Sequence, residues 1–70
     1  MRLRELREDK DLTQQDIANI LSCKQNTYQQ YESGKRQLPT AALKKLCLFY
    51  GVSADYILDL PYGLKYPIRK

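Results

Sequence analysis

Short blocks of helical periodicity, each bounded by a capping or helix-breaking residue, constrain the fold of this chain most strongly. Apolar residues recur three and four positions apart within each block, and blocks this short are not stable as isolated helices. Their apolar stripes must therefore pack against one another. Because 70 residues allow only one compact core, the pattern predicts a single all-α domain of five helices over residues 1–60 and a tail over residues 61–70.

The first two helices are predicted close to the amino terminus. In the first helix Leu3 and Leu6 are three residues apart, which is a helical interval, and the helix is expected to end near Asp9 or Lys10. The second has a clear start, because Thr13 followed three residues later by Asp16 is a capping-box pattern. An apolar stripe then predicts a helix from about Gln14 to Leu21.

The third predicted helix runs from Gln25 to Glu32 and is unusually polar. Tyr28 and Tyr31 are its only large apolar residues, so one narrow side can be buried. Gly34 follows, in the position where a helix usually turns left-handed.

Two further helices complete the pattern. Thr40 is expected to cap the fourth, which Gly51 closes, and Ser53 is expected to cap the fifth. The apolar stripe of the fourth helix is formed by Leu43, Leu46, Cys47 and Tyr50. Contacts from the fifth are expected from Tyr56, Ile57, Leu58 and Leu60.

The composition excludes several classes of function. The chain has no histidine, which excludes Ser-His-Asp and Cys-His catalysis and His-ligated metals. Cys23 and Cys47 lack CxxC spacing, so we expect them to be free thiols that pack in the core. Since the sequence also offers no pair of nucleophile and base, we expect no enzyme activity and no cofactor or metal site. No apolar run could span a bilayer and the amino terminus is too charged for a signal peptide, so we expect a cytoplasmic protein.

The second and third helices carry the functional signal. Two short helices joined by a tight turn match the helix-turn-helix geometry, in which the second helix lies in the DNA major groove. Five glutamines fall within 18 residues, Gln14 to Tyr31, and no acidic residue lies between Ile17 and Tyr31. An amide matches the N6/N7 edge of adenine, whereas a solvated face more usually uses Lys and Glu. The pattern and the net charge of +4 favour a DNA-reading surface over a merely soluble polar helix.

Three motifs, LTQQDIA, YESGKRQLP and GVSADYIL, occur in a characteristic order. From Leu3 to about Leu58 the chain resembles the Cro/C1-type helix-turn-helix domain of phage repressors and bacterial xenobiotic-response-element regulators. The resemblance implies a five-helix, lambda-repressor-like DNA-binding domain that acts as a sequence-specific transcriptional regulator. We expect a repressor, because no activating or sensing domain is attached, and a homodimer on an inverted-repeat operator in double-stranded DNA.

The resemblance also implies roles for single residues. Base contacts are expected from Gln25, Asn26, Gln29 and Gln30. Contacts to the DNA backbone are expected from Gln14, Gln15, Lys24, Thr27, Lys35 and Arg36. Arg7 and Glu32 are expected to form a structural salt bridge between the first and third helices. Candidate dimer contacts, which could instead pack on the fifth helix, are Tyr56, Leu60, Tyr62, Leu64 and Tyr66.

Three positions depart from the family pattern. Ser22 stands where glycine is usual, so the turn either holds a left-handed serine at a cost of about 1 kcal/mol or has another geometry. Lys24 replaces a Ser or Thr cap on the recognition helix. Tyr28 replaces a smaller core residue, and its hydroxyl is expected to find a partner or to reach solvent near the DNA.

A second hypothesis stays open beside DNA binding. The domain could be a protein-interaction module, such as an antitoxin-like or regulatory partner, with an apolar surface around Tyr56, Leu60, Tyr62 and Tyr66. The roles of Arg2 and Arg4 are also open between solvated charges and DNA contacts. The operator sequence and any small-molecule ligand are not specified by the sequence.

Overall fold

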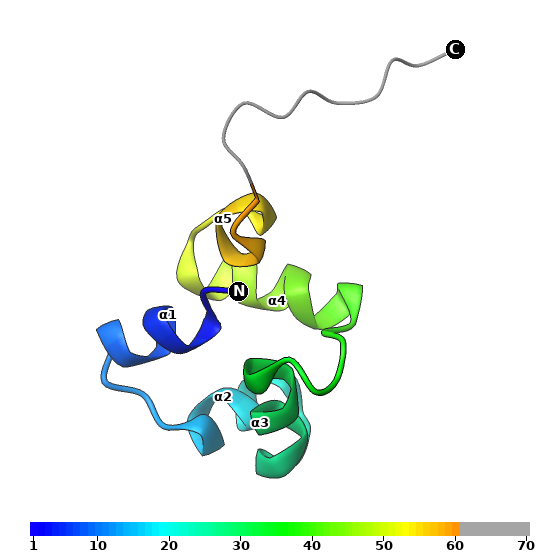
Figure 1. Cartoon of the computed structure of the whole chain (residues 1–70). Helices are drawn as coiled ribbons and strands as arrows, with labels where there is room; N and C mark the ends of the chain where they lie inside the picture. Colours follow the sequence, from blue (N-terminus) through cyan, green and yellow to red (C-terminus); the bar gives the residue numbers. More distant parts are fainter. Residues whose placement is uncertain (61–70) are drawn as a thin grey trace.

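Five α-helices form the part of the chain that the computed structural model describes, residues 1–60 (Figure 1). They are α1 (Leu3–Asp9), α2 (Gln14–Leu21), α3 (Gln25–Ser33), α4 (Thr40–Tyr50) and α5 (Ala54–Leu58). No strand occurs in this range, so the predicted all-α, five-helix fold is confirmed. None of the helices is long and apolar enough to cross a membrane within these residues. The candidate contacts Tyr62, Leu64 and Tyr66 lie outside the described residues.

Every helix contributes at least one side chain to a single core. The buried set is Leu3 from α1, Ile17 and Ala18 from α2, Tyr28 and Tyr31 from α3, Leu46 from α4, and Ile57 from α5. Because no helix is stable by itself, this shared core is what holds the five in place. The narrow apolar side expected for α3 is confirmed, since its two tyrosines are the residues it buries.

The turn between α2 and α3 contains a left-handed serine. Ser22 has φ 57° and ψ 42°, which confirms the first of the two alternatives for this position. The reversal lets the Cys23 amide donate a 2.9 Å hydrogen bond to the Ala18 carbonyl, which satisfies a free carbonyl at the end of α2. The two helices pack together more extensively than any other pair in the described residues.

Two of the three predicted helix caps are confirmed. At α2 the Thr13 amide donates to Asp16 Oδ2 at 2.9 Å, while the Asp16 amide donates to Thr13 Oγ1 at 3.1 Å, completing the capping box. Ser53 caps α5 as expected. The predicted Thr40 cap is wrong, because Pro39 holds the cap position and Thr40 is the first helical residue. The fixed φ of proline suits this position, and its carbonyl accepts the first helical hydrogen bond of α4.

Helix α5 buries less than its sequence suggested. Ile57 is fully buried, but Tyr56, Leu58 and Leu60 keep 47%, 38% and 44% of their surface exposed. A helix of five residues presents one side chain fully to the core in its single full turn, so Tyr56 and Leu58, and Leu60 just after the helix, are only partly covered.

The start of the chain is fastened to α5 by contacts that we call the N-terminal clamp. The Arg2 amide donates to the Ile57 carbonyl at 2.8 Å. The Arg2 guanidinium pairs with Asp59 at 2.9 Å and lies 4.9 Å from the centre of the Tyr56 ring. Residues distant in the sequence thus join α1 to α5, as the position of the amino terminus in Figure 1 also shows.

Candidate nucleic-acid interface

Helix α3 presents amide side chains on the side opposite its buried tyrosines. Gln25, Asn26 and Gln29 are exposed, and they are spaced so that they share one face of the helix. Gln30 and Thr27 lie at its edges and are half-buried. The predicted base-contact residues therefore form a continuous surface, which we call the amide surface.

Most of the residues predicted to contact the DNA backbone flank α3, and Thr27 lies on α3 itself. Gln15 is exposed at the start of α2, where its amide donates to Asn19 Oδ1 at 2.8 Å. After α3, the Arg36 amide donates to the Gln30 carbonyl at 3.1 Å, which folds the loop carrying exposed Lys35 and Arg36 back on the helix end. Cations are thus placed at this end of the amide surface.

Lys24 lies at the other end of the amide surface and begins α3 without a side-chain cap. It occupies the cap position with an extended backbone, and no side-chain hydrogen bond satisfies the free amides of the first turn. A lysine there also faces the positive end of the helix dipole. The prediction that Lys24 is a poor cap is therefore confirmed. The start of α3 at Gln25 is also as predicted.

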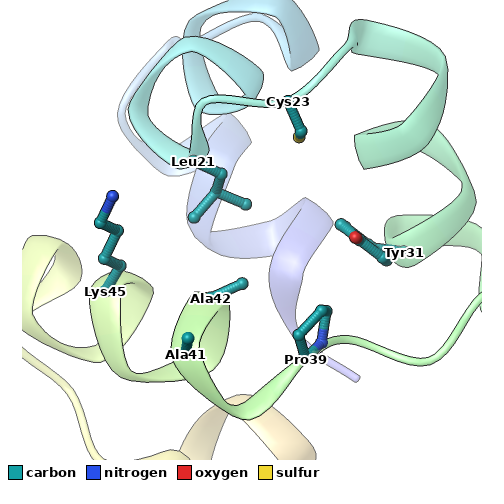
Figure 2. Close-up of a pocket in the computed structure, with 7 residues that line it drawn as sticks. All are labelled: Leu21, Cys23, Tyr31, Pro39, Ala41, Ala42 and Lys45. Carbon is teal, nitrogen blue, oxygen red and sulfur yellow. The ribbon is translucent and has the colours of Figure 1, made fainter.

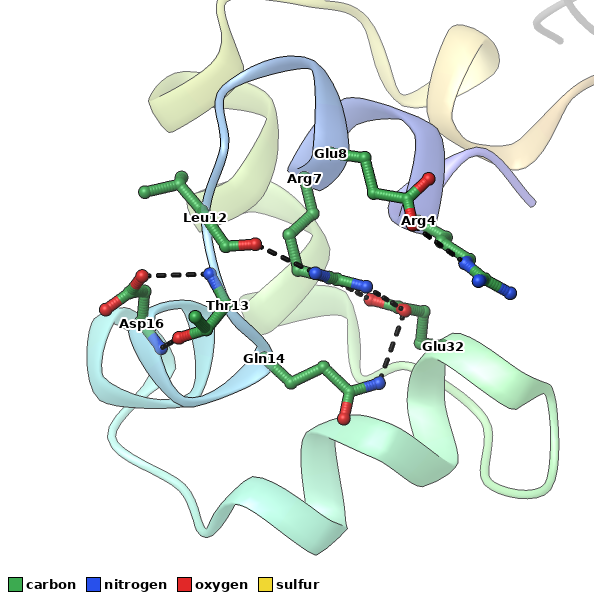
Figure 3. Close-up of polar contacts among 8 residues, drawn as sticks. All are labelled: Arg4, Arg7, Glu8, Leu12, Thr13, Gln14, Asp16 and Glu32. Carbon is green, nitrogen blue, oxygen red and sulfur yellow. Dashed lines mark hydrogen bonds and ion pairs between the residues drawn. The ribbon is translucent and has the colours of Figure 1, made fainter.

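Arg7 and Glu32 form the predicted salt bridge between α1 and α3 (Figure 3). Two parallel hydrogen bonds of 3.0 Å join the guanidinium to the carboxylate, and only 13% and 6% of the two side chains are exposed. Arg7 also donates to the Leu12 carbonyl at 2.8 Å, and Gln14 donates to Glu32 Oε1 at 3.3 Å. The pair therefore fixes the start of α2 as well as the position of α3.

The pair governs the ionisation of its surroundings. Burial alone would raise the pKa of Glu32, but the hydrogen bonds from Arg7 lead the effects that outweigh it and the pKa is lowered. The Arg7 pKa is raised, mainly by the same hydrogen bonds. Burial raises the pKa of Tyr28 above its usual range and that of Tyr50 to about 12, and the nearby Glu32 charge adds to both shifts.

The hydroxyl of Tyr28 does not reach solvent. It is buried, and no group among the described residues meets hydrogen-bond geometry with it, although the Glu32 carboxylate is close. The hydroxyl of Tyr50 is also buried, and it has no hydrogen-bond partner among the described residues. The alternative that the Tyr28 hydroxyl reaches solvent is therefore wrong, and the group close to it is the Glu32 carboxylate, which also accepts hydrogen bonds from Arg7 and Gln14.

Two hollows adjoin α3, and they differ in chemistry. One of about 240 Å³ is mainly apolar and lies between the α2–α3 turn and α4 (Figure 2). Its lining residues are Leu21, Cys23, Tyr31, Pro39, Ala41, Ala42 and Lys45. It shares no residue with the predicted interface, and Cys23 in its wall is a free thiol.

The second hollow, of about 420 Å³, is polar and lies between α1, α2 and α3. We call it the α1–α3 hollow, and its lining residues are Arg4, Arg7, Gln14, Gln29, Glu32 and Ser33. Two of these belong to the predicted interface, whereas Ser33 was missed and Arg4 was left open. The four-residue spacing of Arg4 and Glu8, which pair at 3.1 Å, was the available signal. No group of three or more His, Cys, Asp or Glu side chains in residues 1–60 could hold a metal ion.

Comparison with known proteins identifies the family. A sequence profile described as a helix-turn-helix domain matches residues 1–63. The cryptic phage CTXphi transcriptional repressor RstR of Vibrio cholerae is 39% identical over 59 residues, which cover 83% of this chain and 53% of that protein. The uncharacterized HTH-type transcriptional regulator YobD of Bacillus subtilis (strain 168) is 37% identical over 59 residues, covering 84% and 53%. The chain thus spans about half the length of these relatives, and no solved structure matches significantly.

Proposed function

The chain belongs to the family of helix-turn-helix transcriptional regulators, and on this premise we propose that α3 reads base edges in the major groove of double-stranded DNA. The observation that carries the proposal is the exposed amide surface of Gln25, Asn26 and Gln29, with Gln30 at its edge. Each amide can give and accept a hydrogen bond in one plane, which suits adenine. No acidic residue interrupts this surface before Glu32, whose charge is taken up by Arg7.

Contacts to the sugar-phosphate chain would set the position of α3 in the groove. The residues we assign to them lie on both sides of the amide surface: Gln14, Gln15, Lys24, Thr27, Lys35 and Arg36. Such contacts supply most of the salt-dependent affinity and carry no sequence information. The cationic loop after α3, held by the Gln30 carbonyl, supports this assignment.

We propose that the protein represses transcription as a homodimer. The name of the Vibrio cholerae relative supports repression, and the domain of residues 1–60 is large enough for one half-site only. Two half-sites one helical turn apart, roughly 34 Å, require two copies. Exposed Tyr56 and Leu60 at α5 support a contact there, and residues 61–70 carry the other assigned contacts, Tyr62, Leu64 and Tyr66.

Selection from a random duplex library at near-physiological salt tests the proposal. Enrichment of an inverted repeat is the expected result, and its spacing gives the dimer geometry. No enrichment by a folded protein would contradict base reading and favour the protein-interaction alternative, for which the apolar side chains exposed on α5 provide a surface.

Two variants then separate the two kinds of contact. Gln25→Ala should relax specificity at one base pair, by about 1–3 kcal/mol. Lys35→Ala should instead weaken binding to all sequences alike. Equal effects of both substitutions on every sequence would remove Gln25 from the readout.

A further inference from the structure

The α1–α3 hollow lies at the edge of the amide surface and shares two side chains with it. Gln29 belongs to the exposed face of α3, and Gln14 opens α2. Figure 3 shows the Gln14 side chain reaching toward Glu32, which Arg7 contacts from above, while Arg4 lies farther along α1 and is paired with Glu8. A duplex held against α3 would therefore pass the mouth of this hollow.

The lining of the hollow has the charge and the hydrogen-bond donors to bind an anion with one negative charge, such as a phosphodiester. Its two arginines and one glutamate leave a net positive charge. Glu32 accepts two hydrogen bonds from Arg7 and one from Gln14, so its charge is compensated within the wall. One N–H of the Gln14 amide is used in this way and the other is available, and the Gln29 amide adds further donors.

Arg4 is the cation in this wall that can move. It pairs with Glu8 through one hydrogen bond of 3.1 Å, and 72% and 54% of the two side chains are exposed. A helical pair of this kind contributes only a few tenths of a kcal/mol, which is about twofold in an equilibrium. Arg7, by contrast, is fixed by Glu32 and by the Leu12 carbonyl.

We propose that the α1–α3 hollow receives one phosphate of the DNA backbone, and that Arg4 is exchanged from Glu8 to that phosphate when the duplex binds. The inference rests on the proposed function, since it assigns a further backbone contact to the same DNA complex. It makes α1 part of the interface, with Glu8 holding Arg4 in the free protein.

The salt dependence of DNA binding tests the proposal. The probe is a mixed-sequence duplex of about three helical turns, titrated from about 50 to 200 mM salt. Arg4→Gln should reduce the slope of log K against log salt by about 0.9, the value for one phosphate contact. Lys44→Gln is the matched control: it removes the same charge from an exposed position on α4 and should leave the slope unchanged.

A double-mutant cycle tests the exchange itself. Glu8→Gln frees Arg4 and should strengthen binding about twofold through the lost pair. In the Arg4→Gln background the same substitution should have a smaller effect, because no pair remains to be broken. Neither substitution should unfold the protein, because both side chains are exposed. Arg4 also lies near the positive end of the α1 dipole and Glu8 near its negative end, so removing either charge relieves an unfavourable interaction.

The outcomes distinguish this inference from the proposed function. Wild-type protein that shows no salt-dependent binding to the duplex would contradict the proposed function as a whole. Wild-type binding with equal slopes for Arg4→Gln and Lys44→Gln would overturn the phosphate site alone. Equal effects of Glu8→Gln with and without Arg4 would overturn the exchange.

Discussion

Glu32 is the side chain whose loss should damage the domain most. Its carboxylate takes two hydrogen bonds from Arg7 and one from Gln14, and only 6% of its side chain is exposed. Glu32→Ala leaves the Arg7 charge largely buried without a partner, which costs about 3 kcal/mol. For a domain of this size the melting temperature should fall by roughly 12 °C or more. An unchanged melting temperature would contradict a structural role, and Glu8→Ala serves as an exposed control.

The same carboxylate should make the fold sensitive to acid. Its pKa is lowered from 4.5 in the folded protein, so its contribution is complete above that value and is lost as pH falls through the folded pKa. Urea unfolding measured across this range should show the loss, and Glu32→Gln should flatten it. A variant with the same acid dependence as wild type would assign the effect to other carboxylates.

Tyr50 should make the fold sensitive to alkali. Burial raises its pKa from 10.0 to about 12, so the contribution of Tyr50 to stability is constant below pH 10 and is lost as pH rises through 12. Tyr50→Phe should reduce this decline when unfolding is measured between these values. Near neutral pH the same variant should be as stable as wild type or more stable, because the buried hydroxyl has no hydrogen-bond partner within residues 1–60. A clear loss of stability at neutral pH would show that this hydroxyl is hydrogen-bonded.

At the scale of the helices, α3 should be stabilised by a residue that caps its first turn. Lys24 leaves the first amides of α3 without a cap, whereas Thr13 caps α2 with a complete capping box. Lys24→Ser should supply the missing acceptor and raise stability by about 1 kcal/mol, or roughly 4–8 °C in melting temperature. Thr13→Ala should lower it by a similar amount. A Lys24→Ser variant that melts below wild type would show that the lysine stem contributes packing.

Several helix boundaries were predictable because a local hydrogen bond or a glycine in a left-handed turn sets them, whereas the left-handed Asp59 that ends α5 was not predicted. The capping box of α2, the Ser53 cap and the reversals at Gly34 and Gly51 depend on neighbouring residues, so the sequence contains their signal. Pro39 was missed as a cap because it contributes only its backbone geometry.

The candidate site was predictable to the extent that helical spacing defines it. Spacing identified the amide face of α3, and the family resemblance supplied the Arg7–Glu32 pair. The buried hydroxyl of Tyr28 and the N-terminal clamp were not predictable, because they depend on how distant helices pack.

For the whole molecule, the exposed apolar residues of α5 should determine the oligomeric state. Leu60 is 44% exposed and belongs to the assigned dimer contacts, whereas Leu48 on α4 is 76% exposed and does not. Leu60→Ser should weaken self-association about tenfold, a change typical of a central interface residue, while Leu48→Ser should leave it unaltered. Sedimentation equilibrium measures both. The reverse order would place the dimer contact on α4.

The N-terminal clamp gives the two assigned surfaces a means of influencing each other. Arg2 joins α5 to the start of α1, and Arg7 in the same helix holds Glu32 of α3. A second subunit packed against α5 would therefore stabilise the position of α3, the helix to which we assign DNA reading. Such linkage is reciprocal: whatever factor dimerisation adds to operator affinity, the operator must add to dimerisation. Removing the contacts of Arg2 would then make operator occupancy depend less steeply on protein concentration, although Arg2 belongs to neither of the two assigned surfaces.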